Sequence, residues 1–157
     1  MTTTIPRASA ILGAARTLAA KLLLAVPIDR AALSQAMTES AGGNDAAGAW
    51  QQRDSFEALE VALSLAIPEL VGRMDVGAAI ATLEALAKEL PTHTVRSEDQ
   101  IQFQQFSTPP ALARLAVYLA RLSSDDMLLE PSAGTGIIAS LAKGAVKDLI
   151  LNELEAT

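Results

Sequence analysis

The sequence predicts a mainly α fold, in which an N-terminal helical bundle is followed by a truncated α/β Rossmann-like fragment. Half of the residues are hydrophobic but only 3% are aromatic, and the apolar residues are dominated by Ala and Leu, which are strong helix formers. Apolar residues recur at steps of three and four as far as Leu90, the period of an amphipathic helix. Beyond that point, two short apolar runs flank a Gly-containing turn, which is typical of a strand, helix, strand unit.

Three segments are expected along the 157 residues. Residues 1–91 form the helical domain, residues 92–110 form a linker, and residues 111–157 form the incomplete Rossmann-like fragment. The linker is assigned because its polar residues show no sustained hydrophobic period.

The first two helices of the helical domain are bounded by helix breakers and by a cap. A one-sided apolar stripe between Pro6 and Pro27 predicts a helix over residues 6–26. Asp29 stands where an N-cap belongs, ahead of a second helix over residues 30–39. The Gly-rich segment that follows ends this second helix.

The next two helices are bounded by prolines. Apolar residues on one face predict a third helix over residues 45–67, which Pro68 ends or kinks because proline lacks a backbone donor. A fourth helix is expected over residues 76–90, closed by Pro91. Four amphipathic helices with short connections suggest a small antiparallel bundle, or a cap that rests on whatever follows.

The C-terminal fragment begins with a helix after Pro109, for which Ser107 and Thr108 are candidate caps. Three further elements are expected after that helix: a strand at residues 127–130, a helix at 136–143 and a second strand at 148–152. Units of this type build parallel sheets, so the carboxyl ends of the two strands are expected at the same edge.

The turn between the first strand and the next helix has the features of a ligand site. The strand ends in Glu130, and the turn contains Gly134 and Gly136. Glycine lets a backbone approach a ligand closely, although a packing role for these two glycines alone is an equal alternative. Glu153 follows the second strand, 19 positions beyond Gly134, near the spacing of about 20 residues at which doubly wound folds place the acid that binds ribose. Two strand-end acids around a glycine turn therefore predict a nucleoside pocket.

Composition argues against several other kinds of site. The formal net charge of −6 argues against a grip on a phosphate backbone by this chain alone. Because there is no cysteine and only one histidine, no thiolate or multi-histidine metal centre is expected, and neither a metal ligand nor a catalytic residue is assigned. Arg16 and Lys21 interrupt the apolar N-terminal stretch, so we expect a cytoplasmic protein without a membrane anchor or a signal peptide.

Three other residues are given structural interpretations. Trp50, the only tryptophan, is expected to anchor the core. His93, the only histidine, lies in a polar run and is expected at the surface. Arg7 lies on the polar side of the first helix and is expected to be solvated.

The motifs around the glycine turn resemble those of a known enzyme family. A Phe-x-Thr-Pro sequence (residues 106–109) leads into a helix, and the strand after it ends in Glu-Pro-x-x-Gly-x-Gly. In order and spacing, these motifs resemble the cofactor-binding motifs of N6-adenine DNA methyltransferases. The resemblance implies S-adenosylmethionine as the cofactor, with Phe106 and Thr108 beside its methionine end and Glu153 at its ribose. The residues implied around its middle are Glu130, Ala133, Gly134 and Gly136.

Four segments extend the resemblance over nearly the whole chain: residues 28–33, 42–50, 91–94 and 130–136. They resemble the N-terminal region of bacterial strawberry-notch-type proteins, which join a methyltransferase to a superfamily-2 helicase and are similar to phage antirestriction proteins. This implies the cofactor-binding portion of a larger plasmid or phage protein, whose remaining methyltransferase and helicase domains are its partners and make the DNA contacts. The sequence lacks an Asn or Asp followed by Pro-Pro and an aromatic residue, the motif that holds the target amine in such enzymes, so catalysis by this chain alone is not expected.

A different class of function is the alternative: a small acidic mobile-element protein that inhibits a bacterial defence system, such as restriction or CRISPR, by binding another protein. Negative charge suits a surface that competes with nucleic acid for a basic groove. A helical interaction module with a vestigial glycine turn is a third alternative. Because a two-stranded parallel sheet leaves edges and a face uncovered, we expect the C-terminal fragment to pack on the helical domain, to pair with another chain or a second copy, or to refold as helix.

Overall fold

The computed structural model describes residues 5–92 and 107–153. This part of the chain is mainly helical, which confirms the mainly α part of the fold class expected from the Ala- and Leu-rich composition, and its two short strands are parallel. The chain divides into two compact units, Met1–Ala66 with Glu89–His93 and Ile67–Lys88 with Thr94–Thr157. The segment boundaries expected from the sequence, at residues 91/92 and 110/111, stay predictions.

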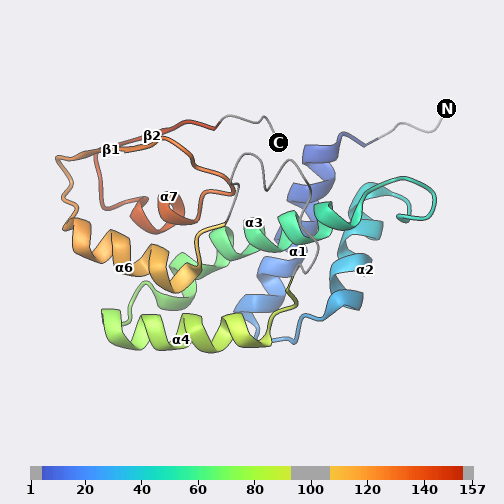
Figure 1. Cartoon of the computed structure of the whole chain (residues 1–157), viewed down its shortest axis with the longest axis horizontal. Helices are drawn as coiled ribbons and strands as arrows, with labels where there is room; N and C mark the ends of the chain where they lie inside the picture. Colours follow the sequence, from blue (N-terminus) through green and yellow to red (C-terminus); the bar gives the residue numbers. More distant parts are fainter. Residues whose placement is uncertain (1–4, 93–106, 154–157) are drawn as a thin grey trace. The chain divides into compact units, whose positions relative to one another are not determined.

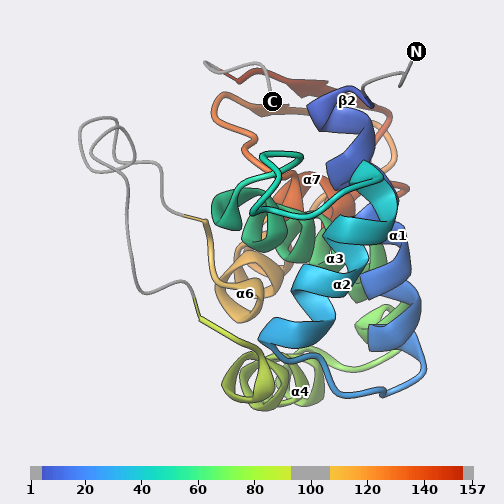
Figure 2. The same ribbon diagram turned by 90° about the vertical axis from the view of Figure 1, so that its right-hand side faces the viewer.

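The first unit is built on the helices α1 (Arg7–Leu23) and α2 (Arg30–Ala41), which lie side by side (Figure 2). Ser40 of α2 ties the two helices together, since its hydroxyl donates to the carbonyl of Ala10 at 2.7 Å. One face of α1 is buried because small and branched apolar residues recur on it at helical spacing. This face comprises Ala10, Ile11, Ala14, Ala15, Leu18, Ala19 and Leu22.

Both ends of α2 follow the predicted chemistry. Asp29 is the N-cap, and its Oδ1 accepts a hydrogen bond from the backbone nitrogen of Ala32 at 2.8 Å. Gly42 closes the helix in the left-handed conformation, with φ of 72°, which a glycine adopts without the steric cost of a Cβ. The helix therefore ends at Ala41, slightly beyond the predicted range.

The third helix, α3 (Gln52–Val71), begins later than the predicted residue 45. The reason is that Asn44 and Asp45 build turns instead: Oδ1 of Asn44 accepts from the nitrogen of Ala47, and the carbonyl of Asp45 accepts from Gly48, each at 2.8 Å. Asn and Asp compete with a helical backbone in this way. The turns lead to Trp50, which is buried as predicted and donates from Nε1 to the carbonyl of Gly43.

The end of α3 also differs from the prediction. Pro68 lies inside the helix, which continues to Val71. Proline removes one backbone donor and bends a helix, but the chain after it can still form the last turn. Of the two predicted alternatives, that Pro68 ends the helix or that it kinks it, the first is therefore wrong.

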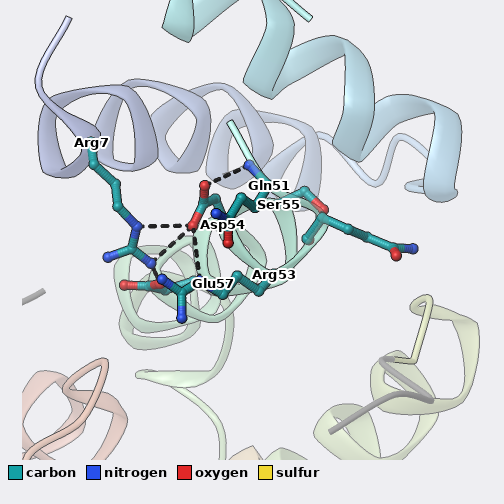
Figure 3. Close-up of polar contacts among 7 residues, drawn as sticks. Arg7, Gln51, Arg53, Asp54, Ser55 and Glu57 are labelled. Carbon is teal, nitrogen blue, oxygen red and sulfur yellow. Dashed lines mark hydrogen bonds and ion pairs between the residues drawn. The ribbon is translucent and has the colours of Figure 1, made fainter. Parts of the chain in front are cut away.

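A buried carboxylate fixes the start of α3 (Figure 3). Asp54 is 3% exposed, and its Oδ2 accepts from the backbone nitrogen of Gln51 at 2.7 Å. Its Oδ1 accepts from Nε of Arg7 at 2.9 Å, and Arg7 also pairs with Glu57. Arg7 is exposed, as expected, but the sequence did not predict that α3 supplies two acids that pair with it. Partial burial alone lowers the pKa of the Arg7 guanidinium, but hydrogen bonds and charges from Asp54 and Glu57 outweigh it and raise that pKa above its ordinary value.

The second unit contains the predicted strand, helix, strand arrangement (Figure 1). β1 (Met127–Glu130) and β2 (Asp148–Leu151) pair in parallel, with Glu130 opposite Leu151 in the register. The helix α7 (Ile137–Ala142) connects the strands. It lies on one face of the pair. Because the strands are parallel, their carboxyl ends lie at the same edge.

Two longer helices belong to this unit, α4 (Val76–Glu89) and α6 (Pro110–Ala120). The last residue of α4, Glu89, is assigned to the first unit. Asp75 caps α4 by accepting from the nitrogen of Ala78 at 3.0 Å. The start of α6 differs from the prediction. Its N-cap is Pro109, without a side-chain hydrogen bond, so neither candidate cap on the residues before it serves that role.

The strand pair has one exposed apolar face. Residues opposite each other in a parallel register share a face, and Leu129 and Ile150 are such a pair, 60% and 48% exposed. Met127, on the same face, is 64% exposed. Parallel sheets are normally covered on both sides. Of the arrangements expected for this fragment, refolding as helix is not adopted, because the strands are present.

None of the helices in residues 5–92 and 107–153 is long and apolar enough to cross a membrane.

Candidate functional site

The turn between β1 and α7 has glycines in a backbone conformation that other residues rarely adopt. Gly134 and Gly136 have φ of 51° and 80°, in the left-handed region that other residues enter at a cost. The nitrogen of Gly136 donates to the carbonyl of Ala133 at 2.8 Å, which closes the turn. A Cβ placed on either glycine would meet no heavy atom within 4 Å. The glycines are therefore required by backbone conformation rather than by packing, and the space in front of them is open to a ligand.

Glu130, the acid at the end of β1, points under this turn. It is 8% exposed, and its Oε2 accepts from the backbone nitrogen of Ala139 in the first turn of α7 at 3.1 Å. Burial raises the pKa of the Glu130 carboxyl above its ordinary value, and the hydrogen bond from Ala139 opposes this rise only in part. Glu130 therefore holds α7 against the strand end.

Glu153, the second predicted acid, lies at the same edge. Its Oε2 accepts from the backbone nitrogen of Gly134 at 2.6 Å, and the side chain is exposed. The sequence separation that suggested a shared pocket thus corresponds to a direct contact between the glycine turn and the second strand end. The two acids differ in environment, since Glu130 is buried beneath the turn and Glu153 lies at its surface.

Asn152 is a residue of this site that the sequence did not single out. Its backbone nitrogen donates to the carbonyl of Glu130 and its carbonyl accepts from Ala133, both at 2.9 Å. Its side-chain Nδ2 donates to the carbonyl of Pro131 at 3.0 Å. One residue thus connects β2 to three positions of the turn. Its position between the last residue of β2 and Glu153 could have indicated its role in the site.

The structure brings together most of the predicted cofactor residues: Glu130, Ala133, Gly134, Gly136 and Glu153. Thr108 lies half-buried just before α6, and no hydrogen bond within the described residues joins its side chain to the turn. Phe106 lies outside the described residues. The cofactor role of all these residues, including the two at the methionine end, stays a prediction.

The turn offers hydrogen-bonding groups and open space. The exposed carboxylate of Glu153 can accept from hydroxyls, and the glycine backbone can come close to a flat or extended ligand. In the part of the chain that the structure describes, no three His, Cys, Asp or Glu residues are grouped so as to hold a metal ion. The geometry suits binding of a polyhydroxylated ligand through acceptors at a strand edge.

The chain matches no protein-family model, and comparisons with curated proteins and with solved structures found no match.

Proposed function

We propose that the β1–α7–β2 segment binds the nucleoside part of S-adenosylmethionine, as the cofactor-binding portion of an N6-adenine DNA methyltransferase with a Rossmann-like fold. The observation that carries the proposal is the contact between Glu153 and Gly134 at the carboxyl edge of a parallel strand pair. Ligands of open α/β sheets bind outside the carboxyl ends of the strands, beside a glycine turn and an acid on the next strand.

In this proposal Glu153 accepts from the ribose hydroxyls. The open space at Gly134 and Gly136 admits the cofactor next to the backbone. Glu130 does not contact the ligand in this proposal; its buried carboxylate positions the first turn of α7 by accepting a hydrogen bond from Ala139. On the resemblance to methyltransferases, the methionine end lies toward Thr108 and Phe106.

The proposal covers cofactor binding and leaves methyl transfer to the parent protein. The sequence contains no Asn or Asp followed by Pro-Pro and an aromatic residue, and its formal charge of −6 does not favour a phosphate backbone. Further methyltransferase and helicase domains would therefore hold the target adenine and the DNA.

Isothermal titration calorimetry with S-adenosylhomocysteine, the stable product analogue, tests cofactor binding. We expect saturable heat with the unaltered chain and binding at least about tenfold weaker for Glu153→Ala, because a charged hydrogen-bond acceptor is lost. Asp125→Ala is the matched control, since Asp125 is also an exposed acid of the second unit and lies away from the turn. Absence of saturable heat at millimolar ligand, or equal binding by Glu153→Ala, would refute the proposal.

A second candidate is supported by the exposed apolar face of Met127, Leu129 and Ile150. An exposed apolar patch on a sheet suits contact with another protein, as in an inhibitor of a bacterial defence system. Protection of phage DNA in cells that carry a restriction or CRISPR system separates the two candidates. A binding role predicts that Leu129→Asp abolishes protection while Glu153→Ala and Gly134→Val preserve it. The opposite pattern favours the cofactor site.

A further inference from the structure

The first unit contains a pocket that the proposed function does not use. Its volume is about 280 Å³, and it lies among the first turns of α2 and α3 and the loop between these helices. Three buried side chains, Leu33, Trp50 and Phe56, line its floor. Exposed charged residues of both signs, Arg30 and Asp45, lie at its rim.

Within residues 5–92 and 107–153, the guanidinium of Arg30 is oriented by a carbonyl and an aromatic ring, and none of the ion pairs there includes it. Its Nη2 donates to the carbonyl of Thr92 at 3.1 Å, and its Cζ lies 5.8 Å from the centre of the Phe56 ring. The ion pairs found among the described residues involve Arg7, Arg53 and two acids of α3, and Arg30 takes part in none of them. A cation that is oriented by a carbonyl and an aromatic ring retains donors for an anion, and arginine matches a carboxylate with two parallel N–H groups.

Asp45 supplies the opposite charge. Its Oδ1 accepts from the backbone nitrogen of Ala46 at 2.9 Å, which fixes the carboxylate. It forms no ion pair within the described residues. The pocket therefore presents one cation and one anion beside three apolar side chains, and its lining also includes the polar residues Ser34, Gln52 and Ser55.

We propose that this pocket binds a free α-amino acid with an apolar side chain. The carboxylate contacts Arg30, the ammonium contacts Asp45, and the side chain rests on Leu33, Trp50 and Phe56. The volume of about 280 Å³ lies just below the roughly 300–1,000 Å³ of pockets for drug-sized molecules, which favours a smaller ligand such as a single amino acid. The site lies in a different unit from the glycine turn, so its test is independent of the cofactor proposal.

Trp50 is the only tryptophan in the chain and lies in the pocket floor, so its fluorescence reports on occupancy directly. We expect leucine to change the emission of Trp50 with a saturating curve. Leucinamide lacks the carboxylate and N-acetyl-leucine lacks the ammonium group, so both should bind at least about tenfold more weakly, since a charged hydrogen bond is lost in each case.

Two variants test the charges separately. Arg30→Gln should weaken leucine binding about tenfold or more and remove the preference over leucinamide. Asp45→Asn keeps the acceptor for Ala46 and should remove the preference over N-acetyl-leucine. Arg16→Gln, on the exposed side of α1, is the matched control and should bind as the unaltered chain does. Circular dichroism verifies that each variant is folded.

Three results would overturn the proposal: no change in Trp50 emission at tens of millimolar leucine, leucine binding unaffected by Arg30→Gln, or N-acetyl-leucine bound as tightly as leucine. The last result would identify the carboxyl end of a peptide as the ligand and remove the role given to Asp45.

Discussion

The side chain of Glu153 accepts a hydrogen bond from the backbone nitrogen of Gly134 at 2.6 Å, across 19 residues of sequence. This bond joins the end of the second strand to the turn after the first. Because both ends lie at the carboxyl edge of a parallel pair, the contact defines where a ligand would meet the chain.

Replacing Gly136 with Ala should destabilise the second unit. Its φ of 80° is left-handed, and a residue with a Cβ pays roughly 1–2 kcal/mol in that conformation. The free energy of unfolding, from urea titration followed by circular dichroism, checks this loss. Gly77→Ala is the control, because Gly77 lies in α4 without a positive φ; its added Cβ would lie 3.3 Å from Oδ1 of Asp75, so its effect should stay within about 1 kcal/mol in either direction. Equal effects of the two substitutions would contradict the role assigned to the turn.

Glu130 should make the stability of the second unit fall as pH rises. Burial raises its pKa in the folded chain above the ordinary value of 4.5. Between these two pKa values the unfolded chain loses its proton while the folded chain retains it, so increasing pH favours unfolding across this window and the full penalty remains above it.

Glu130→Gln removes the titrating group and keeps an oxygen that can accept from Ala139. We therefore expect a flatter stability profile across this window and a variant at least as stable at pH 7. Glu130→Ala should instead lose about 1–3 kcal/mol, because the nitrogen of Ala139 is left without that acceptor. Urea titrations at several pH values measure both effects, and a Gln variant with the same pH slope as the unaltered chain would refute the prediction.

Arg7→Met should destabilise the first unit by about 1–3 kcal/mol, because it leaves the buried carboxylate of Asp54 without its main cation while keeping an apolar stem. Arg16→Met on the same helix is the control, since Arg16 is exposed and its change should stay within about 0.5 kcal/mol. Combining Arg7→Met with Asp54→Asn in a double-mutant cycle measures the coupling. Additive effects would show that the pair contributes nothing of its own.

Asn152→Ala should loosen the glycine turn by a modest amount. The variant loses the side-chain bond to the carbonyl of Pro131, worth about 0.5–1.5 kcal/mol, and keeps both backbone bonds. Asp148→Ala, an exposed position at the other end of β2, is the control. The prediction is checked by unfolding free energy and by the affinity for S-adenosylhomocysteine, and an Asn152 variant that matches the control in both would contradict it.

Much of the fold could be predicted because caps and turns act locally. Asp29 and Gly42 bound α2 through bonds within a few residues of themselves, so their sequence is sufficient to place them. Asn44 and Asp45 are equally local, but the same residue types serve as caps and as turn formers, which is why α3 was predicted to start too early. The two alternatives for Pro68, ending or kinking the helix, stayed open in the sequence because whether a helix passes a proline depends on the turn that follows.

The sequence predicted which residues lie at neighbouring strand ends of the site, but it did not predict their side-chain contacts. The spacing of Gly134 and Glu153 indicates neighbouring strand ends, but the burial of Glu130 beneath α7 depends on how helix and strand pack. The ion pairs of Arg7 were not predicted for the same reason, since its partners lie 47 and 50 residues away along the chain. Two of the three hydrogen bonds of Asn152 to this region involve its backbone, and backbone hydrogen bonds cannot be predicted from the type of the residue.

α7 has six residues, whereas isolated helices shorter than about 12–15 residues are marginal in water. Its first turn depends on a carboxylate that β1 supplies, and β1 depends on β2 for its ladder. Neither strand can separate without releasing the helix, so this region should open as a single cooperative segment. In native-state hydrogen exchange, the amide protons of Ala139 and Gly134 should then exchange with the same opening free energy, although one lies in a helix and the other in a turn.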